Sequence, residues 1–154
     1  MKKATILACI GLFLVLGYCT SYAAEAGTKD EAVAMVKKAI EYMKTNGNDK
    51  AFAVFSDPKD KLFHDRDLYV VVFDMNGKCL AQGQKKSMVG KDMIDFKDVD
   101  GKEYMKERIA LMKANKTAWQ DYKFMNPVSK KIEPKEMYIE RVGDLIVGCG
   151  VYKK

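Results

Sequence analysis

A predicted strand–turn–strand unit near the middle of the chain constrains the fold more than any other feature. Residues 68–73 are rich in β-branched and aromatic side chains, as strands are, and residues 78–82 form a second strand-like stretch. Asn76 and Gly77 lie between them. This dipeptide favours the backbone of a tight hairpin turn. We therefore expect an antiparallel hairpin here, and with it an antiparallel sheet.

The segment before this hairpin predicts two helices. Thr28 precedes Glu31 by three residues, which is the spacing of a capping box at a helix start. Apolar residues then recur at helical period, at Ala32, Met35, Val36, Ala39, Ile40 and Met43. An Asn-Gly pair at residues 46–47 predicts the end of this helix. A shorter helix is expected over residues 50–55.

The segment after the hairpin predicts a loop, a helix and three more strands. Residues 83–100 show no clean period, and Asp100 with Glu103 predicts the start of the helix. Its inward residues are expected to be Tyr104, Met105, Ile109 and Met112. The strand-like stretches are residues 117–124, 136–141 and 145–152. This order favours an α+β fold with five antiparallel strands. A hollow for a small ligand is expected between the sheet and the inserted loop and helix.

The N-terminus has the layout of a secretory signal peptide. A head with two lysines precedes an uncharged stretch, residues 4–24, and small residues such as Ser21 and Ala23 follow its apolar part. We predict a signal peptide over residues 1–23, with a cut one residue later as second choice. The alternatives are a retained membrane anchor and a lipoprotein attached through Cys19 or Cys9.

Composition restricts the classes of protein that fit. The 154 residues suit one domain, and a hydrophobic fraction of 48% excludes wholesale disorder. The net charge is +6, and loss of residues 1–23 removes two lysines and no acid, which leaves +4. Only Arg66, Arg108 and Arg141 are arginine, whereas phosphate readers favour arginine. We expect no nucleic-acid partner, although a small organic anion fits a mildly basic chain.

The residues that carry metal or nucleophilic chemistry are sparse. Two cysteines remain after cleavage, Cys79 and Cys149, and they suit a disulfide or two buried core positions equally well. The chain has no C-x-x-C motif, and its one histidine, His64, lies in a charged loop. The aspartates of residues 92–100 lack the spacing of a calcium loop. We therefore expect no metal, no cofactor, no catalytic residue and no enzyme activity.

Four segments in register resemble the single Cache domain family, and more narrowly its second single-Cache subtype. They are D-L-Y-V-V-V-F-D-M-N-G-K-C-L-A-Q-G, V-G-K-D-M-I-D-F-K-D-V-D-G-K, W-Q-D-Y-K-F-M-N-P and I-E-P-K-E-M-Y-I-E-R-V-G-D-L-I-V-G-C-G-V-Y-K. The predicted long helix before the first segment also matches. The resemblance covers residues 28–153, which we take as the predicted Cache domain.

This resemblance implies a PAS-like Cache fold, in which a five-stranded antiparallel sheet accompanies a long N-terminal helix. Such domains are extracytoplasmic sensory parts of chemoreceptors and histidine kinases, and the single type commonly binds short carboxylates. Because the sequence contains no output domain, it resembles free-standing periplasmic Cache proteins. We expect a periplasmic or otherwise exported ligand-binding domain whose occupancy is read by a membrane-bound receptor or within a homodimer. The alternative is an interaction or dimerisation protein with a vestigial pocket.

The resemblance also indicates ligand-binding residues. A carboxylate that leaves water needs fixed donors, and tyrosine, lysine and tryptophan carry a donor on an apolar body. The W-x-D-Y and E-P-K-x-x-Y segments flank the family's pocket, so the expected ligand-binding residues there are Trp119, Tyr122, Lys135 and Tyr138. Tyr69 and Gln82 are expected to complete the wall from the hairpin. Strict alternation places Trp119 and Tyr122 on opposite faces unless the strand bulges.

The family's strand order bears on the two cysteines. It places the hairpin's first strand between its second strand and the last strand of the chain. Cys79 and Cys149 are then two strands apart, about 9–10 Å at normal spacing. A disulfide requires α-carbons closer than about 7 Å. The resemblance therefore favours two free thiols.

Overall fold

A computed structural model describes residues 26–153 of the chain. The predicted signal peptide over residues 1–23 lies outside these residues. The elements in chain order are α1 (Lys29–Asn46), α2 (Asn48–Phe55), β1 (His64–Asp65), β2 (Leu68–Tyr69), β3 (Val71–Asp74), β4 (Cys79–Gln82), the 3₁₀ turn η1 (Lys86–Met88), α3 (Tyr104–Ala114), β5 (Thr117–Met125), β6 (Ile132–Val142) and β7 (Leu145–Tyr152). Within the described residues no helix combines the length and apolar character needed to cross a membrane.

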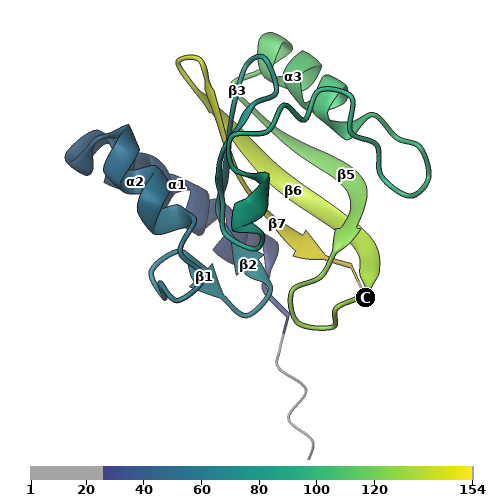
Figure 1. Ribbon diagram of the computed structural model, residues 1–154, viewed down its shortest axis with the longest axis horizontal. Helices are drawn as coiled ribbons and strands as arrows, with labels where there is room; N and C mark the ends of the chain where they lie inside the picture. Colours follow the sequence, from purple (N-terminus) through teal and green to yellow (C-terminus); the bar gives the residue numbers. More distant parts are fainter. Residues whose placement is uncertain (1–25, 154) are drawn as a thin grey trace, which may run out of the picture.

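The sheet has five antiparallel strands, as the sequence analysis predicted, and their order is β4-β3-β7-β6-β5. The hairpin strand β3 lies between β4 and the last strand, β7, because Val71 pairs with Gly148. Strand β6 then joins β7 to the edge strand β5. The small β1–β2 ladder stands apart from this sheet. The long strands β5 and β6 therefore carry the half of the sheet away from the hairpin (Figure 1).

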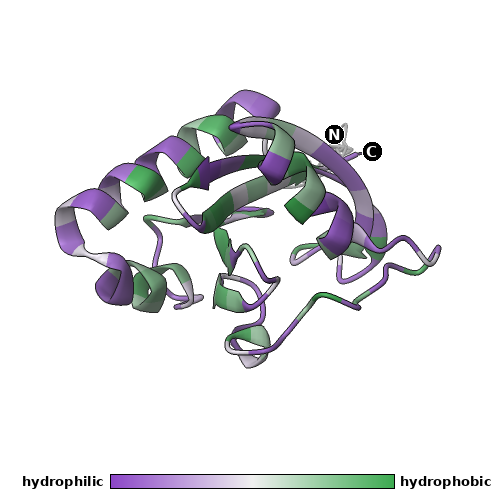
Figure 2. Cartoon of the chain, turned by 90° about the horizontal axis from the view of Figure 1, so that it is seen from above, coloured by the Kyte–Doolittle hydropathy of each residue, from purple (hydrophilic) through white to green (hydrophobic). Residues whose placement is uncertain are grey.

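Helix α1 begins with the predicted capping box. The Thr28 hydroxyl accepts from the backbone N–H of Glu31, and the Glu31 carboxylate accepts from the backbone N–H of Thr28 at 2.8 Å. Both bonds satisfy N–H groups that a helix start leaves unpaired. Hydrophilic and hydrophobic residues alternate along α1, as an amphipathic helix requires (Figure 2).

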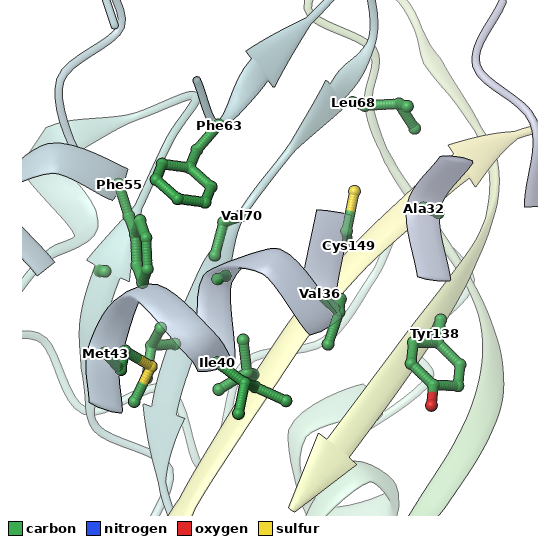
Figure 3. Close-up of a cluster of buried hydrophobic side chains, with 14 of the residues drawn as sticks. Ala32, Val36, Ile40, Met43, Phe55, Phe63, Leu68, Val70, Tyr138 and Cys149 are labelled. Atoms are coloured by element: carbon green, nitrogen blue, oxygen red, sulfur yellow. The ribbon is translucent and has the colours of Figure 1, made fainter. Parts of the chain in front are cut away.

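Two hydrophobic cores lie on opposite faces of the sheet. One packs α1 and α2 against the sheet and contains Phe55, Phe63 and Cys149, with the two phenyl rings 4.5 Å apart (Figure 3). The other lies under residues 83–116, the segment between β4 and β5 that contains η1 and α3 and is called the insertion below. Figure 1 shows α1 and α2 on one side of the sheet and α3 on the other.

Three boundaries differ from the sequence prediction. Residues 68–73 are divided at Val70, because Leu68 and Tyr69 pair with β1 rather than with the sheet. Helix α3 has no side-chain cap and starts at Tyr104, while the Asp98 carboxylate accepts from the backbone N–H groups of Asp100 and Lys102 in the turn before it. Strand β6 begins at Ile132, four residues earlier than expected, because β5 pairs with it through Pro134.

Cys79 and Cys149 are free and buried, as the resemblance favoured. Strand β3 separates their strands, and the two side chains belong to different cores. Burial in apolar surroundings raises the pKa of Cys79 to about 11 and that of Cys149 to about 12. Both groups are therefore unreactive thiols at neutral pH.

Candidate functional site: a buried cationic cavity

The predicted hollow between the sheet and the insertion is present but small. Its volume is about 10 Å³, which is roughly the space that one water needs. The lining residues come from both sheet halves and the insertion: Tyr69, Val71, Phe73, Gln82, Met88, Met93, Tyr104, Arg108, Tyr122, Phe124 and Met137. We call this space the inner cavity. Any ligand larger than water must displace some of these side chains.

Arg108 brings a charged group into this apolar lining. It projects from α3 and is only 1% exposed. Its Nε donates to the Gln120 side-chain oxygen at 2.9 Å, and its guanidinium carbon lies 5.0 Å from the Phe73 ring and 5.2 Å from the Tyr122 ring. Its Nη2 is buried without a hydrogen-bond partner. An unsatisfied buried donor costs about 1–3 kcal/mol, and an acceptor placed in the cavity could remove this cost.

Gln120 holds Arg108 in this orientation. Its side-chain nitrogen donates to the backbone oxygen of Tyr104 at 2.7 Å and to the Glu107 carboxylate at 2.6 Å. These two bonds assign the amide, so its oxygen faces Nε of Arg108. The Glu107 carboxylate therefore accepts from the Gln120 amide, and Nη2 of Arg108 stays without an acceptor among the described residues.

Lys135 supplies a second buried cation beside the cavity. It is 0% exposed, and its Nζ lies 3.9 Å from the centre of the Tyr69 ring and 4.6 Å from that of Tyr152. Its one hydrogen bond is to the Tyr152 hydroxyl at 3.4 Å, so within residues 26–153 no carboxylate pairs with it. Burial lowers the pKa of Lys135 to about 7, and the positive charge of Arg108 acts in the same direction.

A glycine makes room for this lysine. Gly150 of β7 lies across from β6, and a Cβ atom placed on it is 2.6 Å from Cε of Lys135. The Lys135 stem therefore passes over β7 where that strand has no side chain, which brings the ammonium to Tyr69 of β2. Larger residues at position 150 would close this path.

Hydroxyl and amide groups surround the two cations. The Tyr69 hydroxyl donates to the Gln84 side-chain oxygen at 3.0 Å, and Gln82 accepts from the backbone N–H of Gln84 at 2.8 Å. The Tyr122 hydroxyl has only the sulfur of Met137, at 3.9 Å, as an acceptor. Sulfur is a weak acceptor, so this hydroxyl is available to a ligand oxygen. Burial raises the pKa of Tyr122 to about 12, and the Arg108 cation opposes part of this rise.

The structure brings four of the six predicted ligand residues to one side of the sheet. Tyr69, Gln82 and Tyr122 line the inner cavity. Lys135 does not line it, but its Nζ packs against the Tyr69 ring. Alternation along β5 and β6 explains this grouping, because Tyr122 and Lys135 are register partners and share a face.

Trp119 and Tyr138 lie on the opposite face, against α1. Their rings are 5.4 Å apart, and the Lys29 ammonium is 5.0 Å from the Trp119 ring. Figure 3 places Tyr138 beside Val36 of α1, within the other core. No bulge interrupts the β5–β6 register between Trp119 and Tyr122, so strict alternation separates these two residues from the cavity.

Arg108 is the site residue that sequence reasoning missed. Its signal is visible in the sequence: it falls within the inward stripe formed by Tyr104, Met105, Ile109 and Met112. A charged residue inside an otherwise apolar stripe departs from the pattern of a solvated helix face. Such a departure indicates either a buried ion pair or a ligand contact, and here no carboxylate pairs with the guanidinium Nη2.

The charges around the cavity favour an anion. Arg108 contributes a buried cation and Lys135 a buried amine that is partly protonated near neutral pH. The one buried carboxylate among the described residues is Asp67, which accepts from the backbone N–H of Gly27 at 2.7 Å. Among the described residues, no three His, Cys, Asp or Glu side chains are grouped in a way that suits a metal ion. The arrangement can replace the water around a small carboxylate with fixed donors.

Comparison with solved structures identifies the fold as that of chemosensory Cache domains. A methyl-accepting chemotaxis protein from Vibrio parahaemolyticus RIMD 2210633 superposes with a TM-score of 0.69 at 22% identity, over 80% of this chain and 87% of that one. The periplasmic sensor domain of a chemotaxis protein gives 0.65 at 19% identity, over 81% and 90% of the two chains. A Cache chemosensory domain described for carboxylic acid recognition gives 0.65 at 18%, over 81% and 88%.

The chain belongs to the family called Single Cache domain 2, whose sequence pattern matches residues 15–154. This match confirms the resemblance that the sequence analysis stated. The search of curated proteins finds no significant match to the chain.

Proposed function

We propose that this protein is an extracytoplasmic sensing domain that binds a short organic carboxylate in the inner cavity. The observation that carries this proposal is the unpartnered Nη2 of Arg108 in the cavity lining, together with buried Lys135, with which no carboxylate of residues 26–153 pairs. A ligand carboxylate would accept from Arg108 and from the Tyr122 hydroxyl, and its charge would stabilise protonated Lys135. The family membership and the carboxylic-acid-binding Cache relative support the same class of ligand.

The size of the cavity limits the ligand to a small acid. At about 10 Å³ the inner cavity does not hold a carboxylic acid without local movement. Met88 and Met93 line it, and unbranched methionine side chains adapt to irregular spaces at low cost. We expect an acid with only a few carbons to enter by displacing these two side chains, while the sheet residues stay fixed.

The predicted signal peptide and the periplasmic sensor-domain relative support an exported location. In that location the domain would report ligand occupancy to a membrane-bound receptor or within a homodimer. The sensing step would be the rearrangement of the insertion as the cavity opens, because the insertion supplies the residues that must move.

A panel of short carboxylic acids, measured by thermal shift and calorimetry, tests the proposal. At least one acid should raise the melting temperature, since a ligand at about 100 times its Kd stabilises the fold by about 2.7 kcal/mol. Tyr122→Phe should weaken that acid by roughly tenfold, because the variant lacks one hydrogen bond to a charged group.

Tyr138→Phe is the matched control, since it removes the same atom from the opposite face of the sheet. It should leave the affinity within about twofold of the original. Equal losses in both variants, or no response to any acid from folded protein, would contradict carboxylate binding in the inner cavity.

The tightness of the cavity favours one alternative. A protein that keeps the fold but acts through a partner or by dimerising needs no ligand space, and about 10 Å³ suits that role. The absence of any change in melting temperature or heat of binding across the acid panel, together with a stable dimer or a crosslinked membrane partner, would support this second function.

A further inference from the structure

A larger groove lies outside the inner cavity on the same side of the sheet. Its volume is about 480 Å³, which is the size of small-molecule sites. The insertion, the end of β5 and the start of β6 form its walls. We call it the outer groove. Four apolar side chains of its lining are exposed to solvent: Phe96, Val99, Met125 and Ile132.

The rim of this groove is cationic. Lys85, Lys97, Lys123 and Lys130 line it, against one acid, Asp98. The Asp98 carboxylate already accepts from three backbone N–H groups, including that of Lys123 at 3.0 Å. Lys97 and Lys123 pair with Glu103 and Asp100 outside the lining. Among residues 26–153 no acid pairs with Lys85 or Lys130, so the rim presents unneutralised positive charge.

We propose that the outer groove is a second ligand site, which takes an anion with an extended apolar body, such as a medium-chain acyl carboxylate. The apolar floor would bury the chain, and the unpaired lysines would meet the head group. Exposed apolar side chains gathered around one concave space distinguish such a site from scattered surface residues. This inference stands independently of acid binding in the inner cavity.

The two sites share part of their walls. Met88, Tyr104 and Phe124 line both the outer groove and the inner cavity, so they form the partition between them. A chain that packs on one side of this partition changes the space available on the other. Occupancy of the outer groove would therefore alter affinity in the inner cavity, and the effect would be reciprocal.

Calorimetry with decanoate, below its micelle concentration, tests the site on the purified protein. Decanol and decyltrimethylammonium serve as neutral and cationic probes with the same chain. We expect decanoate to bind at least about tenfold more tightly than either, because only it combines the chain with a negative head. Lys85→Gln with Lys130→Gln should remove most of that preference.

A pair of valines provides the matched control. Val99 lines the groove and is 61% exposed, whereas Val128 is 51% exposed and lies outside the lining. Val99→Asp should weaken decanoate by roughly tenfold, since it places a like charge in the apolar floor, and Val128→Asp should change it by less than about twofold. Both positions are exposed, so both variants should fold.

The inference would be overturned by no decanoate binding, by equal effects of the two valine variants, or by decanoate binding that survives Val99→Asp but is lost in Tyr122→Phe. The last result would place the acid in the inner cavity. Decanol binding as tightly as decanoate would also contradict a charged head-group site and would indicate an apolar docking surface for a protein partner. Short acids report on the inner cavity alone, so the two proposals fail separately.

Discussion

At the scale of single residues, the chain keeps two buried cations where hydrophobic side chains would be less costly. Arg108 and Lys135 are almost fully enclosed, and neither is neutralised by a carboxylate in direct contact. Aromatic rings compensate part of the loss of water, since the Lys135 ammonium faces Tyr69 and Tyr152. Perturbed, buried ionisable groups are common at functional sites, which is why the proposal of a ligand site is placed at these two residues.

The pH dependence of stability should reveal the buried lysine. Burial lowers the pKa of Lys135 to about 7, whereas an unfolded lysine has a value of about 10.4. Between these values the unfolded state binds more protons, so the free energy of unfolding should rise as pH increases from 7 to 9. Urea unfolding at half-unit steps measures this slope. Above about pH 9 the two buried thiols oppose this rise in stability. Cysteines ionise there in the unfolded state, whereas the raised pKa values of the buried thiols keep them protonated in the folded state.

Lys135→Met isolates the lysine's contribution. The variant should be more stable than the original at pH 6, by roughly 1–4 kcal/mol, and should lack the rise between pH 7 and 9. Lys113→Met, at an exposed position of α3, is the control and should keep the original slope. A Lys135→Met protein that is less stable at pH 6 would show that the ammonium makes net favourable contacts.

At the scale of elements, strand β7 is adapted to let side chains from β6 cross it. Gly148 and Gly150 lie on the face of β7 that carries the insertion, and Cys149 between them points to the opposite core. The missing side chains of the two glycines leave room over β7 for Met137, which lines the inner cavity, and for Lys135, which lies beside it. The predicted strand 145–152 matches β7 in its bounds. In the sequence its glycines suggest a weakened strand, whereas in the structure they leave room for side chains of β6.

Gly150→Ala tests this packing. The new Cβ atom would lie 2.6 Å from Cε of Lys135, 2.9 Å from the backbone oxygen of Glu136 and 3.0 Å from Cα of Met137. Since two of these atoms are backbone, relief is costly, and we expect a loss of about 3 kcal/mol in chemical unfolding. Gly148→Ala, whose shortest contact is 3.0 Å to the flexible end of Met137, should cost about 1 kcal/mol. Equal losses at the two positions would argue against a specific role for Gly150.

At the scale of the whole molecule, one sheet separates two hydrophobic cores with different tasks. The core under α1 and α2 contains aliphatic and aromatic residues and includes Trp119 at its edge. The core under the insertion also carries the buried cations and hydroxyls. An apolar face and a face with buried polar groups thus lie on opposite sides of the same strands, and alternation along each strand assigns residues to one or the other.

The two cysteine thiols provide a test of the separation between the two cores. Because Cys79 and Cys149 lie in different cores with a strand between them, no disulfide should join them after oxidation of the folded protein. Peptide mapping under non-reducing conditions should recover both as free thiols, and labelling by a thiol reagent should require unfolding. A linked pair of these two cysteines in folded protein would be incompatible with the strand order.

Much of this fold was predictable from sequence because its signals are local. The capping box at Thr28, the Asn-Gly turn at residues 76–77 and the strand periods all act between near neighbours. The start of β6 was not predictable, since Pro134 argues locally against a strand and only pairing with β5 overrides it. Long-range pairing likewise decides how the six candidate ligand residues are grouped: Tyr69, Gln82, Tyr122 and Lys135 share a face, while Trp119 and Tyr138 occupy the other.

The sequence by itself determined the succession of helices and strands, the α+β class and the family, because periodic patterns and turn dipeptides encode them locally. The tertiary structure decided which face each strand residue occupies, which layer covers that face, and that Arg108 lines the inner cavity while Lys135 lies behind Tyr69. These facts depend on strand order and register. Both arise from pairing between segments far apart in the chain, so no local pattern contains them.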